Sequence, residues 1–251
     1  MSWHYRSNAF PLLFMKRILY TSLLLNLLLL GAILWAVQKL GGFGYTWHRL
    51  QHREWGVYYH RAQHFAKLPE RPGSIVFLGD SQIEQAEWHE IFGDKPMILN
   101  RGISGDYTAG VLDRMDEVLR HKPLKIFLLV GINDLFFEKK IPEIEQDYRA
   151  IVRRTRVESP DTELFLLSLL PVNNKVRDIG LQNARIKALN ECIRKIAQDF
   201  ALPYLDVHTP LTDADGNLAA KFTDDGLHIN GLGYVVFKNA LAGSMNNEAE
   251  H

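Results

Sequence analysis

The sequence predicts an α/β domain of three layers, in which helices cover both faces of a five-stranded parallel sheet. Five short apolar runs alternate with longer stretches whose apolar residues recur every three or four positions. Polar or glycine-containing segments directly follow three of these runs, where the strands of an open α/β sheet carry their ligand-binding loops. We expect right-handed crossovers and a flavodoxin-like strand order of 2-1-3-4-5, with a transmembrane helix before the domain.

Composition excludes several classes of protein. The 251 residues are 47% hydrophobic and 23% charged, which is ordinary for a globular protein, and the formal net charge is +0. No overall positive field favours nucleic acid, so no nucleic-acid partner is expected. A single cysteine, Cys192, excludes a disulfide framework or a zinc–cysteine site within one chain.

An uncharged apolar segment at residues 18–37 follows a short N-terminal tail, residues 1–17. About 20 helical residues span a hydrocarbon layer of ~30 Å, so the segment is predicted to be a transmembrane anchor or a signal segment. Lys16 and Arg17 precede it and favour a cytoplasmic N-terminus, although basic residues also follow it. We therefore expect a single-pass protein whose main domain lies on the periplasmic or extracellular side.

Cleavage of this segment is the alternative to anchoring. A signal-peptide cleavage site requires small residues. If the peptide ended at Ala36, Leu34 would occupy a position where a small residue is required. Anchoring is therefore favoured. Met15 could serve as the first residue in place of Met1, and the sequence leaves both starts open.

Residues 38–70 are predicted to form a linker and a helix rich in aromatic and histidine residues. Glycines at 41–44 break the apolar helix, and a helical pattern runs from Tyr45 to about Lys67. Two histidine pairs have the i,i+4 spacing that can place two imidazoles on one metal ion. The pairs are His48 with His52 and His60 with His64. No cysteine or carboxylate motif accompanies them, so we favour a helix that packs on the bilayer or on the following domain.

The domain at residues 71–251 begins with an apolar run, Ile75 to Leu78, which is followed by Gly79, Asp80 and Ser81. A serine just beyond a buried strand is exposed at its tip and held at its base, as a nucleophile requires. The alternative is that these polar residues only start a turn or cap a helix, here predicted near residues 84–92.

Two further strands end in comparable loops. The second, residues 97–100, leads into residues 101–106, whose two glycines permit exposed backbone N–H groups. The third, residues 125–130, is almost entirely apolar and leads into Asn133. Asn133, Gly105 and Ser81 are therefore expected at one edge of the sheet.

The remaining elements complete the alternation of strands and helices. A helix with one apolar face follows the second strand, and Pro142 suits the first turn of another. The later expected elements are a strand at 163–170, a polar loop at 171–180, a helix at 181–200, a strand at 203–207 and a helix at 231–245.

A carboxylate three residues before a histidine lies ahead of the last helix. Asp225 can hold the Nδ1–H of His228 and leave Nε2 facing outwards as a base. Taken alone, the pair would be better explained as a polar loop before the last helix.

Together these motifs resemble the SGNH (GDSL) hydrolase family over about residues 74–245. Within the family the chain looks most like the catalytic subunits of platelet-activating factor acetylhydrolase and their bacterial relatives. Two positions depart from the usual pattern: Gln82 follows the serine where the family name expects leucine, and Asp134 stands where those subunits carry a second asparagine. The motifs, in the family's order, are Gly79-Asp80-Ser81, Gly102-Ile103-Ser104-Gly105-Asp106, Val130-Gly131-Ile132-Asn133 and Asp225-Gly226-Leu227-His228.

The resemblance implies a serine esterase. Ser81 would be the nucleophile, His228 the base and Asp225 the residue that orients the imidazole. The backbone N–H groups of Ser81 and Gly105 and the side-chain amide of Asn133 would form the oxyanion hole. Neither a metal nor an organic cofactor is needed.

The implied activity is hydrolysis of an acetyl, short or medium acyl ester of a lipid or glycan by a membrane-anchored enzyme. Two alternatives remain open: an O-acyltransferase acting on envelope glycans with the same triad, and a catalytically silent binding module. The acyl chain, the alcohol and the oligomeric state are also left open. The pocket walls are expected from residues 82–90, 107–111, 136–140 and 171–180.

Overall fold

The computed structural model describes residues 9–39, 55–93 and 95–245. The chain divides into two compact units, Met1–Trp55 and Gly56–His251. The predicted glycine break at residues 41–44 and the pair of His48 and His52 lie outside the described residues.

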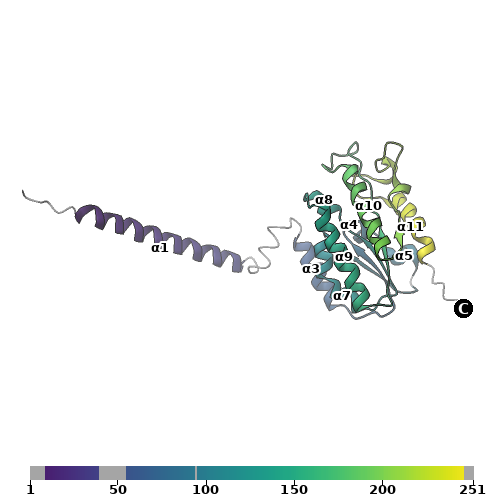
Figure 1. Cartoon of the computed structure of the whole chain (residues 1–251), viewed down its shortest axis with the longest axis horizontal. Helices are drawn as coiled ribbons and strands as arrows, with labels where there is room; N and C mark the ends of the chain where they lie inside the picture. Colours follow the sequence, from purple (N-terminus) through teal and green to yellow (C-terminus); the bar gives the residue numbers. More distant parts are fainter. Residues whose placement is uncertain (1–8, 40–54, 94, 246–251) are drawn as a thin grey trace, which may run out of the picture. The chain divides into compact units, whose positions relative to one another are not determined.

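The first unit contains one long helix, α1 (Ala9–Lys39) (Figure 1). Its segment Phe14–Gln38 has a mean hydropathy of 2.1, and by length and composition it could cross a membrane. A signal sequence near an N-terminus has the same properties. The apolar side chains of this segment are exposed, Leu24 to 58% and Leu30 to 53%, so they find no protein partner within the described chain. The helix includes the predicted apolar segment at residues 18–37.

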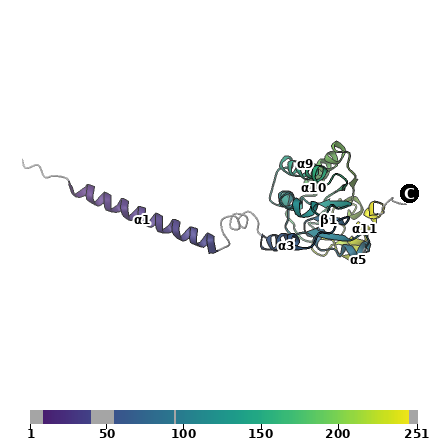
Figure 2. The same cartoon turned by 90° about the horizontal axis from the view of Figure 1, so that it is seen from below.

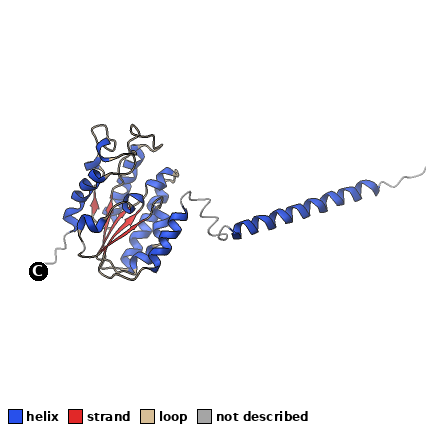
Figure 3. Cartoon of the chain, turned by 180° about the vertical axis from the view of Figure 1, so that it is seen from behind, coloured by secondary structure: helices blue, strands red, loops and turns tan. Residues whose placement is uncertain are grey.

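The second unit is built on a five-stranded parallel sheet in the order β2-β1-β3-β4-β5, which confirms the predicted topology (Figure 3). The inner strand β1 is buried at every position because it lies between neighbours on both sides and helices on both faces. The strands are β1 (Ile75–Gly79), β2 (Ile98–Gly102), β3 (Lys125–Leu129), β4 (Glu163–Leu167) and β5 (Tyr204–Leu205).

The register of the central strands determines where the site can form. Gly79, the last residue of β1, is paired with Gly102 of β2 and with Leu129 of β3. The segments that follow these three residues therefore leave the sheet at the same edge. This confirms that the motifs of the first three strands share one edge.

Helices cover both faces of the sheet, with α9 and α10 on one side and α5 and α11 on the other (Figure 2). One face of α9 is apolar and buried, from Ile144 through Tyr148 to Ile151. The helices are α3 (Trp55–Lys67), α4 (Ser81–Glu84), α5 (Trp88–Phe92), α6 (Thr108–Asp113), α7 (Met115–Leu119), α8 (Ile132–Phe136), α9 (Ile141–Glu158), α10 (Asn183–Asp199) and α11 (Gly231–Met245), with 3-10 turns η1 (Thr209–Leu211) and η2 (Ala220–Phe222).

Stacked aromatic rings fill the core beside the central strands. The ring of Phe77 stacks on Trp88 at 4.0 Å between centroids and on Phe127 at 5.0 Å. Phe127 in turn lies 4.6 Å from Phe165 on the next strand. This row of rings joins β1, β3 and β4 to α5.

The structure differs from the sequence-based expectation in the lengths of some elements. β2 extends through Gly102, so Arg101 belongs to the strand and not to the loop. The helix expected over residues 84–92 is two short helices, α4 and α5. The apolar stretch after the second strand is likewise two helices, because the backbone at Arg114 leaves helical geometry and its side chain turns inwards.

Helix α3 packs on the domain that follows it, one of the two environments expected for it. Phe65 is only 4% exposed. The guanidinium of Arg120 donates to the backbone carbonyl of Phe65 at 3.0 Å and to that of Leu68 at 2.8 Å. His60 and His64 point to solvent on this helix.

Candidate active site

The turn after β1 places a serine at the start of a short helix. A Cβ on Gly79 would lie 1.9 Å from the carbonyl oxygen of Leu129, so the position accepts only glycine. Asp80 then caps α4, since its Oδ1 accepts a hydrogen bond from the backbone N–H of Gln82 at 3.0 Å. Ser81 is the first residue of α4 and is 8% exposed. The capping alternative considered from the sequence is thus correct for Asp80, while Ser81 is left at the sheet edge.

Asp80 is fully buried, and within the described chain its Oδ2 has no hydrogen-bond partner. Burial raises the pKa of this carboxyl from 3.8 to about 8, although the hydrogen bond from Gln82 acts in the opposite direction. Folding therefore favours the protonated form of Asp80 at neutral pH.

This shift predicts a dependence of stability on pH. Between pH 4 and pH 8 the native chain holds a proton on Asp80 that the unfolded chain has lost, so stability falls as pH rises, by about 1.4 kcal/mol per pH unit and proton. Asp80→Asn cannot ionise but keeps an acceptor for the N–H of Gln82. We expect thermal melts of Asp80→Asn to show a smaller loss of Tm from pH 5 to pH 8 than wild type. Equal slopes for the two proteins would contradict a buried, protonated Asp80.

A histidine from the other end of the domain reaches this serine. His228 Nε2 lies 3.0 Å from Ser81 Oγ, and its Nδ1 lies 2.7 Å from Asp225 Oδ2. A carboxylate only accepts, so Nδ1 carries the proton and Nε2 of the neutral ring is free to accept from the serine hydroxyl. The structure thus brings together all three residues that the sequence motifs singled out as nucleophile, base and orienting acid.

The orienting carboxylate is held in its charged form. Burial would raise the pKa of Asp225, but hydrogen bonds from the His228 ring and from the backbone N–H groups of Leu227 and His228 outweigh it and lower the pKa to about 2. Asp225 Oδ1 accepts those backbone bonds at 2.9 and 2.8 Å. The stability that this carboxylate contributes is therefore present above about pH 4 and is lost as pH falls towards 2.

The loop after β2 lies next to Asn133. Gly105 has a positive φ of 77°, which glycine adopts without strain. The side-chain amide of Asn133, in α8, donates to the backbone carbonyl of Asp106 at 2.9 Å, which leaves its second N–H for another acceptor. In the neighbouring position Asp134 accepts from the N–H and hydroxyl of Thr108, at 3.0 and 2.7 Å. Both side chains of this pair thus tie α8 to the loop.

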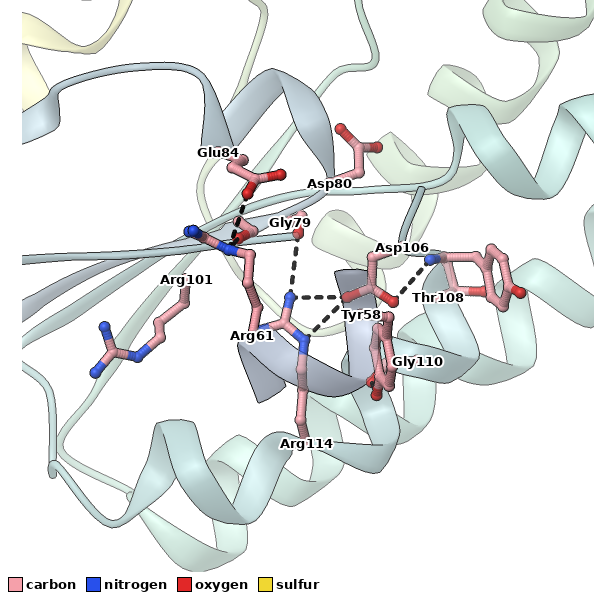
Figure 4. A network of polar contacts seen from close by, with 12 residues as sticks. Tyr58, Arg61, Gly79, Asp80, Glu84, Arg101, Asp106, Thr108, Gly110 and Arg114 are labelled. Atoms are coloured by element: carbon pink, nitrogen blue, oxygen red, sulfur yellow. Dashed lines mark hydrogen bonds and ion pairs between the residues drawn. The ribbon is translucent and has the colours of Figure 1, made fainter. Parts of the chain in front are cut away.

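One buried arginine, to which the motifs gave no role, connects the end of β1 with the loop that follows β2 (Figure 4). Arg114 donates through Nε to Asp106 Oδ2 at 2.9 Å and through Nη2 to the carbonyl of Gly79 at 3.1 Å. Burial raises the pKa of Asp106 to about 7, and the charge of Arg114 opposes that rise. The only sequence signal was an arginine in an otherwise apolar helical face.

Gln82 connects the serine turn to the histidine loop. Its Nε2 donates to the carbonyl of Leu227 at 2.7 Å, while its own backbone carbonyl accepts from the hydroxyl of Tyr234 at 2.9 Å. The residue that departs from the usual leucine therefore fixes the segment beside His228.

Within residues 9–39, 55–93 and 95–245 there is no group of three metal-ligating side chains.

Comparisons with known proteins bear on the family and the fold. A model of the GDSL-like lipase/acylhydrolase family matches residues 77–236. Subunit alpha2 of platelet-activating factor acetylhydrolase IB from Rattus norvegicus is 29% identical over 172 residues, covering 66% of this chain and 73% of the relative. A solved structure from Streptococcus pneumoniae has a TM-score of 0.69 and 30% identity over 84% of this chain and 99% of its own. A GDSL-like lipase from Bacteroides thetaiotaomicron, with a TM-score of 0.64 and 20% identity over 74% and 96%, shares the fold.

Proposed function

Because the chain belongs to the GDSL-like lipase/acylhydrolase family, we propose that it is a serine esterase that cleaves an O-acyl ester through an acyl-enzyme on Ser81. One observation carries the proposal. Ser81 Oγ lies 3.0 Å from His228 Nε2, and Asp225 holds the opposite side of the same imidazole at 2.7 Å. A weak nucleophile, its base and the residue that orients the base are thus in hydrogen-bond contact.

In the first half-reaction Ser81 Oγ attacks the ester carbonyl while His228 Nε2 takes its proton. The tetrahedral intermediate collapses when the C–O bond to the alcohol breaks and the imidazolium returns the proton to the leaving oxygen. Water then attacks the acyl-serine with the same histidine as base, releasing the carboxylic acid and restoring the hydroxyl. Asp225 stays ionised throughout and stabilises the imidazolium.

Three donors would stabilise the oxyanion: the backbone N–H groups of Ser81 and Gly105, and the free N–H of the Asn133 amide. Within the described chain, neither backbone N–H donates to another protein group. Such donors stabilise negative charge that develops on the carbonyl oxygen mainly in the transition state. Their effect on the rate therefore depends on how accurately they point at that oxygen.

We also propose that residues 18–37 anchor the enzyme in a membrane, with the catalytic unit outside the cytoplasm. The exposed apolar surface of α1 supports the anchoring, and the basic pair Lys16 and Arg17 supports the orientation. The substrate would be an acetyl or short acyl ester of a lipid or glycan near that membrane. A C-terminal reporter active only in the cytoplasm would refute the orientation.

The test uses the full chain in detergent. We expect a fluorophosphonate probe to label wild type at Ser81 and to leave Ser81→Ala unlabelled, together with turnover of p-nitrophenyl acetate. A series of longer nitrophenyl esters then measures the acyl pocket, and a glycan acceptor competing with water tests acyl transfer. Absence of both labelling and turnover would indicate a silent binding module.

A further inference from the structure

Helix α3 precedes the part of the chain that the family model matches, and it contacts the loop that carries a proposed oxyanion donor. Arg61 Nε lies 2.9 Å from Glu84 Oε1 (Figure 4). The other oxygen of Glu84 accepts from the backbone N–H of Ser104 at 2.5 Å. One continuous set of contacts therefore runs from α3 through the last residue of α4 to the residue before Gly105.

Two more contacts place α3 on either side of this loop. Arg61 Nε also donates to the carbonyl of Gly102 at 3.2 Å, at the end of β2. The hydroxyl of Tyr58 donates to the carbonyl of Gly110 at 2.9 Å, in α6. The helix thus holds both the entry and the exit of the loop over residues 102–110.

The far end of α3 is itself fixed. The guanidinium of Arg101 lies 4.6 Å from the centroid of the buried Phe65 ring, and Arg120 binds the carbonyls of the last turn. Arg101 is in turn paired with Glu117 at 3.1 Å, in a site where both side chains are less than 10% exposed. A helix fixed in this way can hold a glycine-containing loop in one conformation.

We infer that α3 is part of the catalytic unit, and that Arg61, acting through Glu84, is a positioning residue for the Gly105 oxyanion donor. The inference rests on the proposed esterase function. A loop that turns through Gly105, with φ of 77°, has many alternative conformations available to it. The bond from the Ser104 N–H to Glu84 restricts them, and Arg61 restricts Glu84.

The effect should appear in turnover more than in stability. The side chains of Arg61 and Glu84 are 35% and 18% exposed, and partly exposed ion pairs contribute little to the stability of the fold. A displacement of a catalytic group by about 1 Å can instead cost up to about 100-fold in rate. The two measurements therefore separate positioning from simple structural support.

The experiment compares Arg61→Ala, Arg61→Lys and Lys67→Ala in the full chain with p-nitrophenyl acetate as substrate. Lys67 is an exposed cation on the same helix and is the matched control. We expect kcat of Arg61→Ala to fall about tenfold with KM within about twofold. Arg61→Lys should recover part of the loss, and Lys67→Ala should behave as wild type. Thermal melts confirm that each variant is folded.

A second readout reports the oxyanion hole directly. A trifluoromethyl ketone forms a hemiketal oxyanion on the serine, so its inhibition constant should rise about as much as kcat falls in Arg61→Ala. Adding Arg61→Ala to Glu84→Ala should cause little further loss, because both remove the same connection.

Wild-type kcat and ketone affinity in folded Arg61→Ala would overturn the inference. So would full additivity of Arg61→Ala and Glu84→Ala. Ser81→Ala in the same assay distinguishes a failure of the proposed function from a failure of the positioning role. If Ser81→Ala stays active, the proposed function is wrong. If it is inactive while Arg61→Ala is normal, only the positioning role is wrong.

Discussion

Ser81→Ala is expected to reduce the rate of ester hydrolysis by about 10⁴-fold or more. The remaining rate should be the low rate that the folded protein supports without a nucleophile. The hydroxyl is the proposed nucleophile, and no other described side chain lies within hydrogen-bond contact of His228 Nε2. The fold should be unaffected, since the change removes a single oxygen at the sheet edge. Steady-state turnover of p-nitrophenyl acetate by purified variants with matching circular dichroism measures this.

His228→Ala should be nearly as damaging, because serine at neutral pH is a poor nucleophile without a base. The double variant of Ser81→Ala and His228→Ala should be hardly worse than Ser81→Ala alone, since the two residues act as one unit. Asp225→Ala should cost less than either, because it orients the base and does not touch the reacting atoms. Substantial turnover in Ser81→Ala would show that Ser81 is not the nucleophile. The proposed roles of Gly105 and Asn133 as oxyanion donors would then be wrong as well.

Asn133→Ala is expected to lower kcat by about 10²–10³-fold, the usual effect of removing one oxyanion donor. KM should change much less, because the negative charge that the amide meets exists mainly in the transition state. The change also removes the bond to the Asp106 carbonyl, so a control must lose a comparable bond elsewhere.

Thr162→Ala provides that control. Its hydroxyl donates to the carbonyl of Pro123 at 2.6 Å, at the sheet edge opposite the site, and has no proposed catalytic role. If Thr162→Ala and Asn133→Ala lower Tm by similar amounts but only Asn133→Ala loses turnover, the effect is catalytic. Equal losses of kcat in the two variants would count against Asn133 as an oxyanion donor.

The sheet and the meeting of Ser81 with His228 were predictable, because they depend on patterns that sequence displays directly. Apolar runs marked the strands, and the carboxyl ends of parallel strands necessarily share an edge. Asp225 could be paired with His228 because it lies only three positions before it in the chain.

Features set by tertiary contacts were not predictable. The helical pattern of the sequence continues through Arg114, but the helix is interrupted there. The guanidinium of Arg114 turns inwards and donates to Asp106 and to the carbonyl of Gly79. In the same way, the bond from Gln82 to the Leu227 carbonyl joins residues far apart in sequence, with no local signal at either position. The contact of Arg61 with Glu84 likewise depends on how α3 lies against the sheet edge.

The serine and the histidine that meet in this site are separated by 147 positions of chain. The loop that carries His228 follows every strand in the chain, and bringing two such distant residues together has an entropic cost. During synthesis the nucleophile leaves the ribosome long before its base, so the nascent chain has no competent hydrolase until almost all of it has emerged. On refolding, recovery of esterase activity should follow recovery of the far-ultraviolet helical signal and never precede it. Activity is therefore a measure of completed folding, whereas the circular dichroism signal is a measure of its beginning.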